Sequence, residues 1–347
     1  MWINAYSTRR TSIATPFVDG EVTQRQMWAD DAATTRPDEE FRQHLNEFGA
    51  WVWQSAGEQM TPELYLLLQH ISNAQIQYAF AVDDSSPEFM DEFSDWAVES
   101  NSILYTEYAE VLDPHGLSLI PVDGKAAPGS TPIITEAAER ATKWRRFLST
   151  EQQIAVPDSL PPGRSTDELV PQTNRDIALR IICLALISDF ATATLNGRQI
   201  NPADMQQVYP QAFTALSPTE IRLMQTRDPQ LAAQLAWRAE SLKELLWATG
   251  RTTLDWPEQL CDATRIRGLV YEHREDVFIE ATRLRNLAEL ADEQERTRDI
   301  MWALREHQHF GGRPVPGTNH DIVMERLTAV NWLLARGANW DEVDTPT

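Results

Sequence analysis

Cysteine is scarce in this sequence, with two residues in 347, and glycine, with 14, is below its usual share. Two cysteines cannot form the disulfide framework of a small secreted domain, and so little glycine excludes a collagen-like or low-complexity chain. The apolar fraction of 42% is enough for a substantial core. The sequence therefore predicts a soluble globular protein with one large or two ordinary domains.

Basic residues are also few, with 30 Lys and Arg against 52 Asp and Glu, which gives a net charge of −22. Phosphate backbones and anionic lipids bind clustered Lys and Arg, so we expect neither nucleic acid nor a membrane surface as a partner. The charge favours a basic protein partner. The alternative is that acidity only keeps the protein soluble. The sequence does not indicate an oligomeric state.

Long apolar runs are missing as well. The first residues contain no basic stretch followed by an apolar segment, so no secretory signal is expected. The most apolar segment, residues 177–195, contains Arg180 and Asp189 and predicts a buried helix rather than a membrane span. Together with the low cysteine content, this predicts a cytoplasmic protein with free thiols.

The common nucleotide-binding, zinc-protease, serine-hydrolase and dithiol motifs are absent. No catalytic residue is assigned, and neither a cofactor nor a metal is expected. His307, His309 and His320 form the one histidine cluster. Metal binding is one interpretation of it. The preferred interpretation is a polar helix end, where imidazole favours the negative pole of the helix dipole.

The organisation of the chain follows from two Pro/Gly/Ser-rich stretches, residues 113–132 and 156–166, which flank a predicted helix at 136–148. We expect an N-terminal domain at 1–125, a linker with one helix at 126–165, and a helical domain at 166–347. No repeat of 20–50 residues is visible, which excludes a solenoid.

The N-terminal region mixes strand and helix patterns. Residues 2–6, 75–82 and 103–108 are short and rich in aromatic and β-branched residues, as strands are, and a turn followed by a strand is expected within 111–120. Thr61-Pro62-Glu63 is a helix start. The fold class predicted is α+β, with a small α+β domain followed by a larger, mainly helical domain.

Helix signals dominate the C-terminal region. Ser217 and Glu220 have the spacing of a capping box. A single helix is expected from Asp228, with leucines on one stripe from Leu231 to Leu246, and Gly250 is the left-handed residue that ends it. Two further helices are expected at 288–307 and 321–334.

Spaced tryptophans in this region resemble the DUF4272 family, a domain of unknown function. The elements that carry the resemblance are Trp237-Arg238-Ala239-Glu240, residues 245–250, Leu254, Pro257, Cys261-Asp262, Leu284-Arg285, Arg298, Trp302-Ala303, Glu325-Arg326, Ala329, Asn331-Trp332-Leu333 and residues 340–345. They cover roughly 165–347, and residues 3–8 are similar to the opening of longer members. The resemblance implies a helical domain and no activity, catalytic residue or cofactor. The sequence departs from the family pattern at 286–298, where Glu295 and Asp299 stand without a nearby tyrosine.

Twelve residues of this region form the candidate binding or structural motif: Trp237, Arg238, Glu240, Trp247, Arg285, Trp302, Glu325, Arg326, Asn331, Trp332, Trp340 and Asp341. The tryptophans could line a groove, although large rings that fill space between helices are the preferred interpretation. The arginines and glutamates could hold a ligand anion, or pair with each other to fix the helices.

These observations favour a non-catalytic binding or regulatory module with an acidic surface, in a sharper form an immunity-type or inhibitor protein. The alternative is an enzyme of unrecognised type with its site between the two domains.

Overall fold

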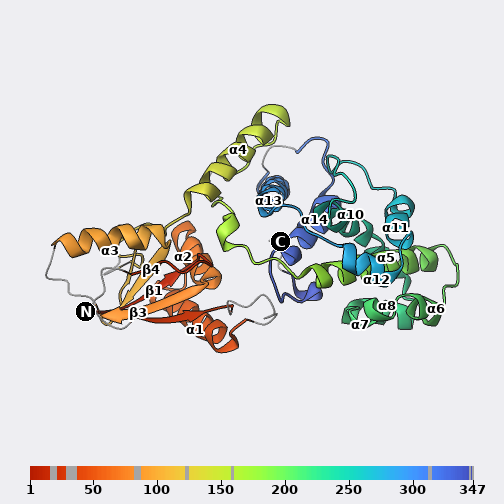
Figure 1. The fold of residues 1–347 in the computed structure, drawn as a ribbon. Helices are drawn as coiled ribbons and strands as arrows, with labels where there is room; N and C mark the ends of the chain where they lie inside the picture. The colour runs from red at the N-terminus through yellow and green to blue at the C-terminus, as the bar shows by residue number, and fades with distance from the viewer. Residues whose placement is uncertain are drawn as a thin grey trace. The chain divides into compact units, whose positions relative to one another are not determined.

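The computed structural model describes residues 1–15, 22–28, 37–81, 87–121, 125–157, 160–311, 315–343 and 345 (Figure 1). The chain divides into two compact units. The N-terminal unit contains residues 1–139 and 164–168, and the helical unit contains residues 140–163 and 169–347. The division falls within α4 (Thr135–Glu151).

A five-stranded antiparallel sheet forms the centre of the N-terminal unit, in the order β2-β3-β1-β4-β5. The strands are β1 (Trp2–Ser7), β2 (Thr23–Gln26), β3 (Ile76–Ala81), β4 (Ser102–Thr106) and β5 (Val111–Leu112). In register, Ala5 of β1 lies opposite Tyr78 of β3 and Leu104 of β4. Val82, the last residue of the strand predicted at 75–82, lies outside the described residues.

Helices cover both faces of this sheet (Figure 1). They are α1 (Glu39–Ser55), α2 (Pro62–Asn73) and α3 (Pro87–Glu99). The unit also contains a short 3₁₀ turn, η1 (Thr166–Glu168). Alternation along β1 sends Tyr6 toward α1 and α2, and Ile3 and Ala5 toward α3. The Thr61 hydroxyl accepts from the Leu64 N–H and caps α2, as its sequence predicts.

The helical unit is built around α5 (Asn174–Leu195). Around it lie α6 (Pro202–Val208), α7 (Pro210–Thr214), α8 (Pro218–Thr226), α9 (Pro229–Ala236), α10 (Arg238–Ala248), α11 (Ala263–Tyr271), α12 (Glu275–Ala281), α13 (Leu287–Phe310), α14 (His320–Leu333) and the 3₁₀ turn η2 (Trp340–Glu342). An α+β region followed by a larger helical region confirms the predicted fold class.

Helix α5 is buried along nearly its whole length, from Ile177 to Ala193. By length and composition it is the one described helix that could cross a membrane, but 83% of its most apolar window is buried inside the unit. A core helix of a water-soluble domain passes the same test, so the helix is accounted for by packing.

The prediction of a single helix from Asp228 to Gly250 is wrong, because the structure has two helices there, α9 and α10. Trp237 ends α9 and begins α10, because its N–H bonds to the Gln234 carbonyl and its own carbonyl accepts from Glu240, both three residues away. These tighter turns replace the four-residue ladder of a continuous helix. The break separates α9, which packs on α5, from α10, which packs on both α5 and α14.

Candidate functional site

Two arginine–glutamate pairs cross between α10 and α14. Arg238 of α10 donates from Nη1 to both carboxylate oxygens of Glu325 of α14, each at 3.0 Å. The neighbouring residue of α14, Arg326, donates from Nη2 to Glu240 of α10 at 3.3 Å. Each helix thus supplies one cation and one anion. The Ser241 hydroxyl also donates to the Glu325 carboxylate, which holds that side chain at the helix interface.

The Arg326–Glu240 pair also anchors the segment between α10 and α11. Arg326 donates from Nη1 to the carbonyl of Asp255 at 2.7 Å, and Glu240 accepts from the Cys261 N–H at 2.6 Å. Burial, followed by the nearby Glu240 carboxylate, raises the pKa of Cys261 to about 12. The thiol is therefore protonated at neutral pH and is a poor nucleophile.

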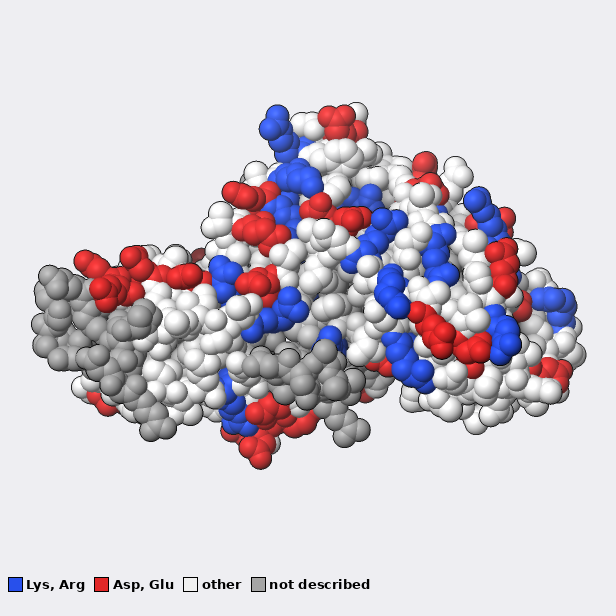
Figure 2. All heavy atoms as spheres, in the orientation of Figure 1, with Lys and Arg blue, Asp and Glu red and all other residues white. Residues whose placement is uncertain are grey.

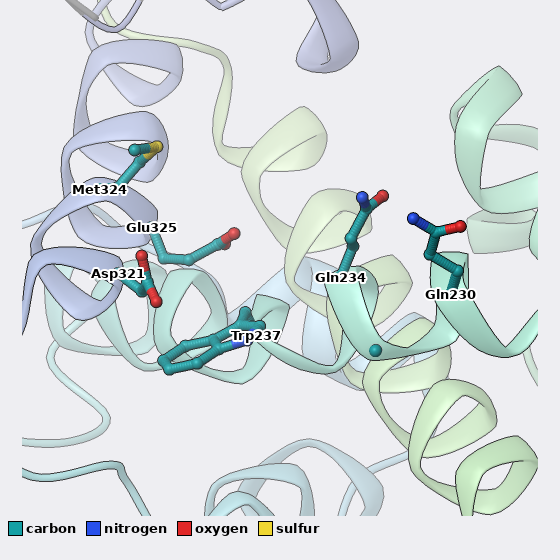
Figure 3. Close-up of a pocket in the computed structure, with 7 residues that line it drawn as sticks. Gln230, Gln234, Trp237, Asp321, Met324 and Glu325 are labelled. Atoms are coloured by element: carbon teal, nitrogen blue, oxygen red, sulfur yellow. The ribbon is translucent and has the colours of Figure 1, made fainter.

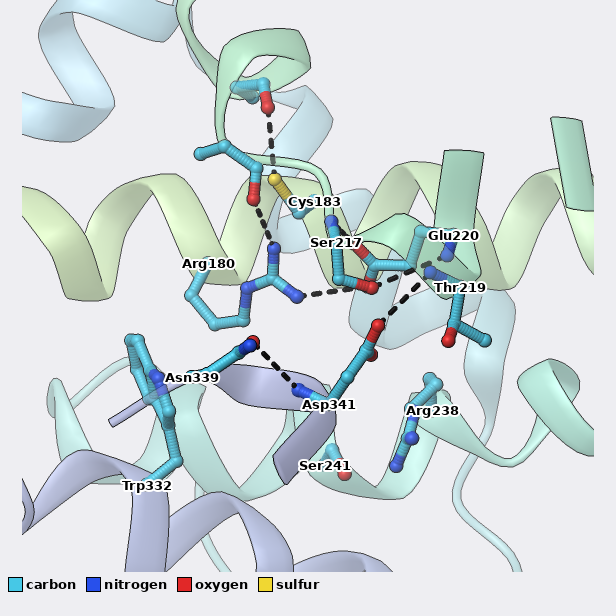
Figure 4. A network of polar contacts seen from close by, with 12 residues as sticks. Arg180, Cys183, Ser217, Thr219, Glu220, Arg238, Ser241, Trp332, Asn339 and Asp341 are labelled. Carbon is cyan, nitrogen blue, oxygen red and sulfur yellow. Dashed lines mark hydrogen bonds and ion pairs between the residues drawn. The ribbon is translucent and has the colours of Figure 1, made fainter. Parts of the chain in front are cut away.

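Two guanidinium groups contact the ring of Trp340 in η2. The Arg180 and Arg238 guanidinium carbons lie 5.0 and 5.5 Å from its ring centroid, and the Trp332 ring meets it edge-on at 5.5 Å. The Arg180 guanidinium also donates a hydrogen bond from Nη1 to the Glu220 carboxylate, with a donor–acceptor distance of 2.9 Å (Figure 4). Cation–π contact and ring packing therefore give Trp340 a buried, structural position.

The same network ties η2 to the start of α8. The Asp341 carboxylate accepts from the Thr219 N–H at 3.0 Å (Figure 4). Ser217 and Glu220 make both hydrogen bonds of the capping box, which confirms that prediction. Asp344, another acidic residue of the family pattern, lies outside the described residues.

Other members of the predicted motif lie apart from these pairs. Arg285 stacks on Trp247, with its guanidinium carbon 5.2 Å from the ring centroid, and donates to the Trp247 carbonyl. Trp302 is covered by Arg305 at 4.8 Å. Asn331 accepts from Gln294 of α13. The motif therefore does not gather into one site.

The departure from the family pattern on α13 has a structural counterpart. The buried Glu295 carboxylate accepts from the Gly163 N–H at 2.8 Å, and a Cβ on Gly163 would lie closer to this carboxylate than van der Waals contact allows. The Asp299 carboxylate accepts a hydrogen bond from Arg145 of α4. Burial raises the pKa of Asp299 to about 6. These acids attach α4 and the 160–163 segment to α13.

Sequence reasoning missed two buried charged residues of α10, Lys243 and Glu244. Lys243 Nζ bonds to Asp255 at 2.9 Å. Glu244 is fully buried, and both of its carboxylate oxygens lack a hydrogen-bond partner among the described residues. No local pattern identifies them, because charged residues between leucines are also what the exposed face of an amphipathic helix contains.

Trp237, at the break between α9 and α10, forms the wall of a surface groove of about 430 Å³ (Figure 3). We call this the Trp237 groove; its lining residues are Gln230, Ala233, Gln234, Trp237, Asp321, Met324 and Glu325. In Figure 3 the Asp321 and Glu325 carboxylates approach from α14 on the side of the indole ring, and the two glutamine amides stand on α9. Among the described residues that line it there are two carboxylates and no basic side chain.

Charges on the visible face of the helical unit are mixed. Figure 2 shows Lys and Arg interspersed with Asp and Glu over this face, without a continuous acidic patch. The net charge of −22 is therefore a property of the chain as a whole and not of this face.

The three histidines lie at helix ends. His307 and His309 are in the last turn of α13, and His320 begins α14 and bonds to Asp321 at 3.1 Å. Within the described part of the chain, no three His, Cys, Asp or Glu side chains are placed to hold a metal ion.

Comparison with protein families identifies one match, to a domain of unknown function, DUF4272, over residues 140–343. Neither the curated proteins nor the solved structures contain a match to this chain. The match covers more than half of the sequence and includes the tryptophan and arginine–glutamate elements that α10 and α14 bring together. The chain belongs to the DUF4272 family.

Proposed function

We propose that this protein is a non-catalytic binding module, and that the Trp237 groove receives a Lys or Arg side chain of a basic protein partner. An inhibitor or immunity-type protein that covers a basic surface is one form of such a module. The observation that carries the proposal is the composition of the groove, whose described lining places an indole wall beside two carboxylates and includes no basic side chain.

A cation suits this groove for two physical reasons. The face of an indole ring attracts a cation, and Trp237 is only half-buried. Asp321 adds a carboxylate whose side chain is 60% exposed, whereas Glu325 is already paired with Arg238 and mainly shapes the wall. Oδ1 of Asp321 also bonds to the His320 ring, but the Asp321 side chain is much the more exposed of the two, so it is the carboxylate that a ligand can reach.

The remaining lining suits a peptide. Gln230 and Gln234 are exposed on consecutive turns of α9 and can exchange hydrogen bonds with an extended backbone. Met324 adds an adaptable apolar contact for the methylene stem of Lys or Arg. The net charge of −22 would increase the rate at which a basic partner approaches.

Catalysis receives less support from the titratable groups. The carboxyl and thiol groups with raised pKa values, Glu244, Asp299, Cys183 and Cys261, are buried or half-buried and none lines the Trp237 groove. A catalytic acid or nucleophile must reach its substrate. Cys261 lines the cavity between α10 and α11, but its raised pKa keeps the thiol protonated at neutral pH. A raised pKa is the ordinary result of burial.

The test is selection of peptides from a displayed random library by the full-length protein. Selected peptides should be enriched in Lys or Arg, and Trp237→Ala and Asp321→Asn should each weaken their binding. Association should slow as salt rises from about 0.05 to 0.5 M, because the screening length falls to a few ångströms.

The matched control is Asp276→Asn, which also removes an exposed acid from the first turn of a helix but lies outside the groove. It should leave peptide binding unchanged. Selection of peptides without basic residues, or equal binding by the Trp237→Ala protein, would contradict the proposal.

A further inference from the structure

A second cavity, of about 380 Å³, lies between α10, the start of α11 and the segment that joins them. We call it the Lys243 cavity. Its described lining combines two cations, three carboxylates and an apolar wall; the residues used below are Lys243, Asp255, Trp256, Glu258, Leu260, Asp262 and Arg265. It shares no lining residue with the Trp237 groove.

Lys243 is an unusual residue to find inside this cavity. Its side chain is only 7% exposed, and its ammonium is bonded to Asp255, whose side chain is 80% exposed. Lysine is rarely buried, because desolvation of an ammonium costs several kcal/mol and a partner in water repays little of it. A helix packed only for stability gains more from an apolar residue at this position.

The main chain at Asp255 is held independently of the bond between its side chain and Lys243. Its backbone carbonyl is held by Arg326 at 2.7 Å, so the main chain stays fixed while the exposed side chain turns to solvent. The hydrogen bond from Lys243 lowers the pKa of Asp255, so this side chain is a carboxylate at neutral pH. It therefore occupies the place that the carboxylate of a ligand would take.

The other charges of the cavity decide between ligand classes. Lys243 and Arg265 oppose Asp255, Glu258 and Asp262, so the lining has one negative charge in excess. A simple anion would increase that excess and be disfavoured. A zwitterion leaves the balance unchanged, because it brings a carboxylate for Lys243 and an ammonium for an acid such as Glu258.

The apolar wall indicates what the zwitterion carries. Trp256 is half-buried, and Leu260 is 62% exposed, one of the most exposed large apolar side chains of the described chain. Both line the cavity. An apolar group that covers Leu260 removes exposed hydrocarbon from water, which favours binding in proportion to the area buried.

We propose that the Lys243 cavity binds a free apolar α-amino acid. Its carboxylate replaces that of Asp255 on Lys243, its ammonium meets Glu258, and its side chain lies against Trp256 and Leu260. This is a small-molecule site separate from the Trp237 groove, and it does not depend on the function proposed for that groove.

Calorimetric titration of the full-length protein tests the proposal with L-leucine and L-phenylalanine as probes. N-acetyl-L-leucine, which lacks the ammonium, and L-leucinamide, which lacks the carboxylate, should each bind at least about tenfold more weakly than leucine. Glu258→Gln should lower the affinity for leucine by a similar factor.

Asp255→Asn distinguishes a ligand site from a structural ion pair, and because the Asp255 side chain is 80% exposed and asparagine has nearly the same shape, the substitution introduces no steric clash. Removal of the competing carboxylate should increase the affinity for leucine. It should increase the affinity for N-acetyl-leucine even more, because the lining of the cavity no longer carries an excess negative charge. Asp276→Asn is the control and should change neither.

Three results would overturn the proposal. One is the absence of binding by both amino acids up to about 10 mM. Another is equal affinity for leucine and N-acetyl-leucine. The third is loss of stability in Asp255→Asn without any change in affinity, which is the result expected if the Lys243–Asp255 pair is only structural.

Discussion

At the scale of single residues, Glu244 is the most unusual group of the helical unit. It lies among two carboxylates, Glu240 and Glu293, and two guanidinium groups, Arg296 and Arg326. These four charges balance one another, so an ionised Glu244 would be a surplus charge in a dry interior. Burial first, and repulsion from Glu293 second, raise its pKa well above the ordinary value of a glutamate.

This gives a pH-dependent prediction for Glu244→Gln. In the native state Glu244 keeps its proton above the pH at which the unfolded chain loses it, about 4.3. The free energy of unfolding of the wild type therefore loses up to about 1.4 kcal/mol per pH unit above that value, until Glu244 ionises in the folded protein. Glutamine does not titrate, so the stability of the variant relative to wild type should rise with pH.

Denaturant unfolding between about pH 4 and 8 measures this difference. Glu280→Gln, at an exposed position near the end of α12, is the control and should run parallel to wild type. A constant difference between Glu244→Gln and wild type over this range would show that the glutamate is ionised in the fold.

At the scale of elements, the end of α10 depends on a left-handed residue. Gly250 has φ 75°, its N–H bonds to the Trp247 carbonyl, and the Arg251 N–H bonds to the Leu246 carbonyl. These two bonds form a Schellman motif, which confirms the cap predicted at Gly250. Space is not the constraint, because a Cβ on Gly250 would meet nothing within 4 Å.

We predict that Gly250→Ala lowers the free energy of unfolding by about 1 kcal/mol, because an L-residue resists positive φ. Gly268, inside α11, also has free space around its Cβ position but has no positive φ. Gly268→Ala should therefore stabilise the protein by about 0.5–1 kcal/mol. Thermal and denaturant melts of both variants test the pair, and effects of the same sign would refute the conformational argument.

The sequence correctly predicted those features that depend on residues close together in the chain. The capping box of α8 and the cap at Gly250 depend on residues within a turn of one another, and both are confirmed. The break at Trp237 has no Pro or Gly to mark it, so the leucine stripe continued through it. Tertiary packing on two different partners decided that break.

The candidate sites were less predictable, since their partners are distant in sequence. Glu240 and Arg326 are 86 residues apart, and Arg238 and Glu325 are 87 apart. The sequence identified all four as site residues but did not indicate which glutamate each arginine pairs with. Lys243 had no signal, because its position between helices is a property of the packed unit alone.

At the scale of the whole molecule, the helical unit is organised by the burial of α5. Amide hydrogens of such a helix exchange only when the unit around it unfolds. We predict that peptides from residues 174–195 exchange most slowly in deuterium exchange followed by mass spectrometry. Helix α6, which has no buried residue, is the internal control and should exchange by local opening. Equal rates for α5 and α6 would show that the packing around α5 is loose.

The position of α5 in the chain has a consequence for synthesis on the ribosome. This apolar helix is made before α9, α10 and α14, the helices that cover it or complete its core. The end of α14 is translated about 140 residues after the end of α5, which at ~5–20 residues per second is a delay on the order of 10 s. For that time the nascent chain displays an unburied stretch apolar enough to attract chaperones or the machinery that inserts membrane proteins. The Arg180 and Asp189 charges within α5 oppose insertion during this interval.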